Sequence, residues 1–232
     1  MSRAVSGEHH PGDYSPTARA VGGLRRGGDN MGKLRIPPSR LCRHEVAIVA
    51  DPGNRTVLNQ NTSHMLKTRT GFEFEVRVAS AADEPLLAEF FKHVADDDLR
   101  FRFLSGQKTV SHDQLVMMTR HDRQTENFLA LAADGTLIAT AMLACDAARE
   151  HGEVAISIRS DYKARGIGWE LLTYVGGYAE ASGIHTLESV ESRANHAAIE
   201  LEREMGFTVS SCPGDATLVI VRRDLRPASL AA

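Results

Sequence analysis

The stretch Lys163-Ala-Arg-Gly-Ile-Gly168 combines two basic side chains with two glycines that are one residue apart. If a helix begins here, its first backbone N–H groups have no intrahelical partner and carry partial positive charge. Gly166 and Gly168 would let an anion approach those groups and would permit a positive φ. Lys163 and Arg165 add charges that suit a pyrophosphate. The pattern is compatible with phosphate binding, although a tight connection between two elements uses the same residue types.

The residues on either side of this turn predict a strand and a helix. Residues 153–158, EVAISI, alternate in part and include β-branched side chains, which is typical of a buried strand. A helix is expected over 166–182, because apolar residues recur there at the spacing of one helical face, namely Trp169, Leu172, Val175 and Ala179. The sequence therefore predicts a strand, a glycine-rich turn and a helix in succession.

The same patterns place further elements before and after this unit. Residues 95–106 combine charged and aromatic side chains and are expected to form an irregular connector. The fold class predicted from the whole order is α/β (α+β), with a mixed, mostly antiparallel sheet flanked by helices. The expected elements are a strand at 72–79, helices opening at Ser80 and Ser111, strands on both sides of Asp134-Gly135, the unit above, a strand near 185–190, a helix over 195–205 and a final strand pair.

Charge and composition divide the chain of 232 residues. Residues 1–71 carry 11 Lys/Arg and 5 Asp/Glu, whereas the remainder carries 16 and 25. Five of the eight prolines also lie in the first seventy residues, which show little periodicity. We therefore expect a mostly disordered basic leader over 1–70, one folded domain over 71–226 and a disordered tail over 227–232. The net negative charge of this domain argues against binding to nucleic acid, whose phosphates favour basic surfaces, but it suits a cationic substrate.

The remaining composition argues against several classes of protein. Cys42, Cys145 and Cys212 are odd in number and lack metal-ligand spacing, and the histidines are scattered, so neither a disulfide framework nor a metal site is expected. No apolar run approaches the length of a membrane span, and no signal peptide is visible. The expectation is a cytoplasmic protein with no membrane partner, and the oligomeric state stays open.

Two motifs in this order of elements resemble the GNAT acetyltransferase superfamily over about residues 74–223. The family signature, Gln/Arg-x-x-Gly-x-Gly/Ala, resembles KARGIG at 163–168, with Lys163 for Gln or Arg and with Ala164 where the family often has Gly. Residues 195–207, NHAAIELEREMGF, resemble the second family motif. A dinucleotide-binding βαβ unit is excluded, because the third glycine is absent and antiparallel strands precede the turn.

The resemblance implies that acetyl-CoA is the cosubstrate and that the chain is an N-acetyltransferase. The strand at 153–158 would splay from the strand near 185–190 and free backbone groups for the pantetheine arm. The residues implied in cosubstrate binding are Ile156, Ile158, Lys163, Arg165, Gly166, Ile167, Gly168 and Asn195. From the sequence alone, Asn195 is equally a good helix N-cap.

Catalysis needs a base, because a lysine-type amine has a pKa of about 10.4 and is almost fully protonated at neutral pH. Glu153 is the predicted general base, although a solvated carboxylate at a strand end is the alternative. The stretch EVAISIRSDYKARGIG and the connector LRFRF at 99–103 resemble the bacterial protein-lysine acetyltransferases, in which the matching glutamate is the proposed base. Many GNAT enzymes have a Tyr where this chain has Glu202, and we expect that glutamate to be exposed.

The acceptor implied by this subgroup is a protein lysine. Two alternatives remain open: a small-molecule amine, or a non-catalytic module that senses acyl-CoA. Arg100 and Arg102 could orient a substrate or form surface ion pairs with the preceding aspartates. The rings of Phe101, Phe103 and Trp169 are expected in the core.

Overall fold

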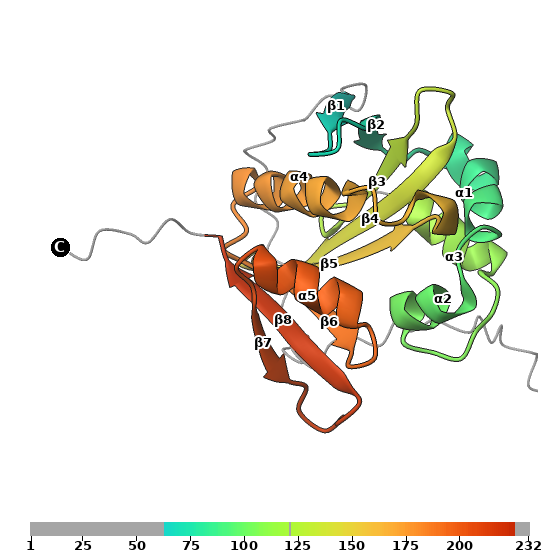
Figure 1. Ribbon diagram of the computed structural model, residues 1–232. Helices are drawn as coiled ribbons and strands as arrows, with labels where there is room; N and C mark the ends of the chain where they lie inside the picture. Colours follow the sequence, from blue (N-terminus) through green and yellow to red (C-terminus); the bar gives the residue numbers. More distant parts are fainter. Residues whose placement is uncertain (1–62, 121, 226–232) are drawn as a thin grey trace, which may run out of the picture. The chain divides into compact units, whose positions relative to one another are not determined.

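The computed structural model describes residues 63–120 and 122–225. The disorder predicted for the leader and for the tail at 227–232 falls on residues 1–62 and 226–232, which lie outside this range. One sheet of eight strands forms the centre, in the order β1-β2-β3-β4-β5-β6-β8-β7 (Figure 1). The strands are β1 (His64–Lys67), β2 (Glu73–Val78), β3 (Thr125–Leu131), β4 (Leu137–Cys145), β5 (His151–Ile158), β6 (Thr186–Ser192), β7 (Thr208–Ser211) and β8 (Leu218–Asp224).

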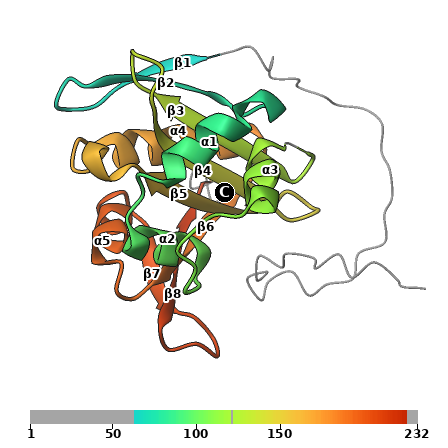
Figure 2. The ribbon, with the colours of Figure 1, turned by 90° about the vertical axis from the view of Figure 1, so that its right-hand side faces the viewer.

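Helices cover both faces of the sheet. Figures 1 and 2 show α4 and α5 on one face and α1, α2 and α3 on the other. Phe128 and Leu129 illustrate the division, because neighbouring residues of a strand point to opposite faces: Phe128 joins the core under α4, and Leu129 joins the core under α1 and α3. The helices are α1 (Glu84–Phe91), α2 (Asp96–Phe103), α3 (His112–Thr119), α4 (Ile167–Ala181) and α5 (His196–Glu204).

All neighbouring strands pair antiparallel except β5 and β6. These two run parallel and pair only at His151–Thr186, Gly152–Leu187 and Glu153–Glu188. The predicted mixed, mostly antiparallel sheet flanked by helices is therefore confirmed. The predicted hairpin is confirmed as well, since β3 and β4 pair on both sides of the turn in which Gly135 has φ +82°.

The irregular connector predicted for 95–106 is wrong, because most of it forms helix α2. Aspartates fill the first turn of α2 and arginines its last turn, which complements the helix dipole. Apolar residues recur at every second position, Leu99, Phe101 and Phe103, so the helical period is hidden in the sequence. Leu104 ends the helix with φ +47° where a glycine would have marked the end.

Strand β1 lies in the segment assigned to the basic leader, N-terminal to the predicted domain boundary at residue 71. It pairs antiparallel with β2 from His64 to Lys67 and forms the edge of the sheet. Four residues with little apolar alternation give almost no strand signal in the sequence. Within the described residues, no helix has the length and apolar character needed to cross a membrane.

Candidate functional site

A cavity of about 1080 Å³ opens where β5 and β6 separate. Its walls come from α2, α3, β3, β4, β5, α4, β6 and α5, so it lies between helices of both faces of the sheet. We call residues Lys163–Gly168 the glycine turn. We call Glu153, Glu191 and Glu202, together with Arg102, the carboxylate cluster. Both groups contribute side chains or backbone to the lining of this one cavity.

The predicted divergence of β5 from β6 is confirmed, because pairing between them stops at Glu153. Arg159 donates its backbone N–H to Ile138 on β4. Since backbone groups of a strand alternate in direction, Ile156 and Ile158 turn their N–H and C=O groups toward the side from which β6 has departed. These groups lie in the cavity wall and can bond an extended ligand as a missing strand would.

The glycine turn leads directly into α4. Gly166 is the N-cap and has φ +83°, a conformation that glycine adopts without strain. A Cβ at Gly168 would lie 3.2 Å from Ile158 Cδ1, so the absence of a side chain keeps the passage between β5 and α4 open. Ile167 is buried and anchors the start of the helix. Ala164 has φ +57°, in the left-handed region that glycine adopts most easily, which explains why a glycine suits that position.

The two cations of the glycine turn both contact other residues of the chain. Lys163 Nζ donates to Asp98 Oδ1 at 2.6 Å and lines the cavity. Arg165 donates to the carbonyl of Asp161, and its guanidinium lies 4.6 Å from the centre of the Tyr162 ring. Arg165 is exposed and does not line the cavity. The backbone of the turn, with Lys163 beside it, therefore forms the surface that could receive a phosphate.

The carboxylate cluster is shaped by burial. Desolvation, and to a smaller degree the neighbouring Glu202, raises the pKa of Glu191 to about 8, although Asn195 and Arg102 oppose the rise. Burial lowers the pKa of Arg102 to about 10, against the attraction of Glu153 and Glu191. The Nε of Arg102 is buried without a hydrogen-bond partner among the described residues. The cluster is thus a group of mutually interacting charges with incomplete hydrogen bonding.

The expectation that Glu202 is exposed is wrong. Its side chain is 5% exposed, and the Ser189 hydroxyl donates to its Oε1 at 2.5 Å. Burial raises the pKa of Glu202 to about 7, and the Ser189 hydrogen bond opposes that rise. Oε2 is buried with no hydrogen-bond partner among the described residues. Glu202 is buried because it lies on the inward face of the amphipathic helix α5, three residues after the buried Ile199.

Asn195 occupies the N-cap position of α5, yet its side chain makes no capping hydrogen bond. Its Nδ2 instead donates to Glu191 Oε2 at 2.7 Å, and the residue lines the cavity. The arginines of α2 divide between the two alternatives. Arg100 forms an exposed ion pair with Asp97 at 3.1 Å, whereas Arg102 belongs to the cavity wall.

Most of the residues predicted from the sequence meet in this cavity. Phe101 and Phe103, expected in the core, are half-buried and line it, and Trp169 is half-buried beneath Arg69. Sequence reasoning missed Glu191, whose only signal is its position near the end of an expected strand. Among the described residues, no group of three or more His, Cys, Asp or Glu side chains could hold a metal ion. The predicted residues that line the cavity are Glu153, Ile156, Ile158, Lys163, Gly166, Ile167, Gly168 and Asn195.

Solved structures resemble this fold. The GNAT domain of PAT from S. lividans covers 70% of this chain and 96% of its own length, with a TM-score of 0.65 and 22% identity. Spermidine N-acetyltransferase from Vibrio cholerae, solved with CoA and spermine, covers 66% of this chain and 95% of its own length, with a TM-score of 0.55 and 17% identity. At these identities the likeness shows the fold alone.

Sequence comparisons identify the family. An acetyltransferase of Pseudomonas aeruginosa, PA5475, is 30% identical over 151 residues, which are 63% of this chain and 81% of that protein. The sequence pattern of the Acetyltransferase (GNAT) family matches residues 90–207, about half of the chain. This match spans the glycine turn, the divergence of β5 from β6 and all four members of the carboxylate cluster. The chain therefore belongs to the GNAT acetyltransferase family and is an acetyl-CoA-dependent N-acetyltransferase.

Proposed function

We propose that this enzyme transfers the acetyl group of acetyl-CoA to the side-chain amine of a protein lysine, by direct attack within a ternary complex. The observation that carries the proposal is the continuity of one cavity from the glycine turn, along the unpaired edge of β5, to the carboxylate cluster. A diphosphate at one end and an ammonium group at the other would each meet a complementary charge.

The cosubstrate would lie in an extended form along this cavity. The N–H groups at the start of α4, at Gly166, Ile167 and Gly168, would hold the pyrophosphate, and Lys163 and Arg165 would add charge. The backbone of Ile156 and Ile158 would bond the pantetheine arm, with one N–H polarising the thioester carbonyl. Asn195, which borders the same cavity, would contact the arm as well.

Glu153 would act as general base. It lies at the last paired position of β5 and β6, where the cavity begins. The neutral amine attacks the thioester carbonyl carbon, a C–N bond forms, the C–S bond breaks and the CoA thiolate leaves. The bound ammonium first loses one proton to the Glu153 carboxylate, directly or through water, which gives the neutral amine. The second proton, lost by the nitrogen after the attack, passes to the departing CoA thiolate. Arg102 attracts Glu153 electrostatically, so the proposed base has a cation as a neighbour.

The lining of the cavity favours a lysine side chain over a polyamine. Its carboxylates are the three of the cluster and Asp98, and Asp98 is paired with Lys163. The remaining wall toward α2 and α3 is apolar or neutral, and it includes Phe101, Leu104 and Met118. An alkyl chain with one terminal ammonium suits this arrangement. A polyamine would place further ammonium groups against neutral walls, at a desolvation cost. The lysine acceptor also agrees with the subgroup resemblance of residues 153–168.

Substitution of the proposed base tests the mechanism. Glu153→Gln should lower kcat by ~10²-fold or more, because the amide cannot accept the proton. The affinity for acetyl-CoA, measured by calorimetry, should not change. Glu150→Gln is the matched control, since Glu150 is exposed just before β5 and does not line the cavity. An unchanged kcat in Glu153→Gln would remove this carboxylate from the mechanism.

A second assay tests the acceptor. The purified enzyme and acetyl-CoA are offered a folded acyl-CoA synthetase, an Nα-blocked lysine and a panel of polyamines and amino sugars, and acetylated products are identified by mass spectrometry. Preferred acetylation of the folded protein supports the proposal. Preferred turnover of a free amine would establish a small-molecule enzyme instead. Binding of acetyl-CoA without turnover of any amine would favour an acyl-CoA-sensing module.

A further inference from the structure

A second, smaller groove continues from the main cavity on the outer side of the glycine turn. It measures about 480 Å³ and shares Gly166, Ala197 and Leu201 with the main cavity. Its other walls come from the turn between β1 and β2 and from the first turns of α4 and α5. A ligand that passes over the glycine turn therefore emerges in this groove.

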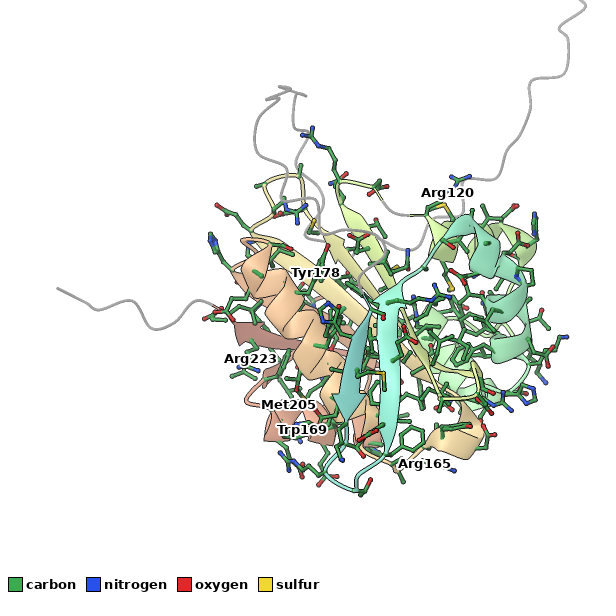
Figure 3. All side chains as sticks on the ribbon, turned by 90° about the horizontal axis from the view of Figure 1, so that it is seen from above. Arg120, Arg165, Trp169, Tyr178, Met205 and Arg223 are labelled. Carbon is green, nitrogen blue, oxygen red and sulfur yellow. The ribbon has the colours of Figure 1, made fainter. Side chains whose placement is uncertain are left out.

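The groove pairs a cation with an aromatic ring. The guanidinium of Arg69 lies 4.4 Å from the centre of the Trp169 ring, within the range of a cation–π contact. Arg69 is exposed and forms no ion pair with any other described residue. Figure 3 shows Trp169 and Arg165 on either side of the turn between β1 and β2. A planar ring could stack on Trp169 here, and a phosphate could pair with Arg69.

The turn that carries Arg69 is held against the glycine turn. Thr68 is 3% exposed, and its Oγ1 accepts a hydrogen bond from the Phe72 backbone N–H at 3.1 Å. Thr70 Oγ1 donates to the Arg165 carbonyl at 3.3 Å. A Cβ at Gly166 would lie 3.3 Å from Thr68 Cβ, so the two turns are in close contact. Arg69 is thus presented by a packed turn beside the proposed pyrophosphate site.

The charges around the groove restrict where an anion could bind. Three glutamates, Glu170, Glu200 and Glu204, line the groove and would repel a phosphate. Arg69 is the one cation among the described lining residues. A dianionic group could bind here only close to that guanidinium, since charge-assisted hydrogen bonds from arginine to phosphate are strong and directional.

We propose that Arg69 and Trp169 form the binding site for the 3′-phosphoadenosine end of CoA. Arg69 would pair with the 3′-phosphate, and the face of the Trp169 indole that Arg69 now covers would stack on adenine. This inference rests on the proposed position of the pyrophosphate at the glycine turn. With the pantetheine arm directed along β5 toward Glu153, the nucleotide must leave the turn on the opposite side, where this groove lies.

The test compares CoA with 3′-dephospho-CoA, which lacks only the phosphate assigned to Arg69. In calorimetry on the full chain, Arg69→Gln should weaken CoA binding by about 10-fold and dephospho-CoA binding by less than about two-fold. Trp169→Leu should weaken both ligands to a similar degree. Lys67→Gln is the matched control, because Lys67 is an exposed cation two residues before Arg69 that pairs with Glu73; it should change neither affinity.

The outcomes separate this inference from the proposed function. If the unaltered protein binds CoA and Arg69→Gln weakens both ligands equally, or neither, the assignment of Arg69 to the 3′-phosphate is overturned while the site at the glycine turn stands. If the unaltered protein binds neither CoA nor dephospho-CoA, both proposals fail. Because Arg69 is exposed, its replacement should leave the thermal unfolding midpoint unchanged, and that measurement accompanies each titration.

Discussion

The two ends of the cavity are built in opposite ways. The glycine turn consists of consecutive residues, and its recognition surface is backbone whose geometry depends on positive φ values at Ala164 and Gly166. The carboxylate cluster draws its members from α2, β5, β6 and α5, and its properties come from side chains and burial. One end is therefore determined by local sequence, the other by tertiary structure.

The electrostatics differ in the same way. At the glycine turn, Lys163 and Arg165 reach solvent, and an ion pair such as Lys163–Asp98 is partly screened and contributes little to stability. In the cluster, desolvation is the largest influence on the pKa of Glu191, Glu202 and Arg102. Substitutions at the first end should act through shape, and substitutions at the second should act through charge and pH.

The largest effect of shape is expected at Gly168. In Gly168→Val the new side chain would meet Ile158 Cδ1 at 3.2 Å and Leu201 Cδ1 at 3.5 Å, and it would narrow the passage proposed for CoA. We expect the Kd for CoA to rise by ~10²-fold, about 2.7 kcal/mol, as measured by calorimetry. Gly177→Val, on the same helix, is the control, because a Cβ there meets nothing within 4 Å. Equal affinities of the two variants would contradict recognition by the bare turn.

A smaller, pH-dependent effect is expected at the other end. Arg102 lowers the pKa of Glu191 and attracts Glu153, so Arg102→Met should raise the pKa of Glu191 and should remove a cation from the vicinity of Glu153. We expect kcat/KM to fall by ~10-fold at pH 7 and to recover as the pH rises. Arg100→Met, an exposed arginine of the same helix, should leave the profile unchanged, and Arg102→Lys should restore much of it. A loss that is uniform across pH would assign Arg102 a purely structural role.

The same contrast explains what the sequence could predict. The glycine turn, the strand before it and the helix after it are contiguous, so residue type and spacing were sufficient to locate them. The membership of Arg102 and Glu191 in the site depends on how α2 and β6 pack, and neither periodicity nor a motif reports that. Glu202 was expected in solvent because glutamate usually lies there, whereas α5 turns it inward. Arg69 lay outside the predicted domain, since β1 is too short to be recognised.

The smallest effect that distinguishes the two ends concerns stability. The pKa of Glu202 is about 7 in the folded chain, above the ordinary value of about 4.5, so between these pH values the folded state binds more protons than the unfolded state. The stabilising contribution of the protonated carboxyl is complete below about pH 4.5 and is lost as the pH rises through about 7. Relative to Glu202→Gln, the native chain should therefore lose about 2 kcal/mol of unfolding free energy between pH 5 and pH 8, measured by urea denaturation. Glu204→Gln, exposed on the same helix, should parallel the native chain. If Glu202→Gln also parallels it, the carboxyl ionises freely, and the contrast between a pH-indifferent turn and a pH-sensitive cluster no longer holds at this residue.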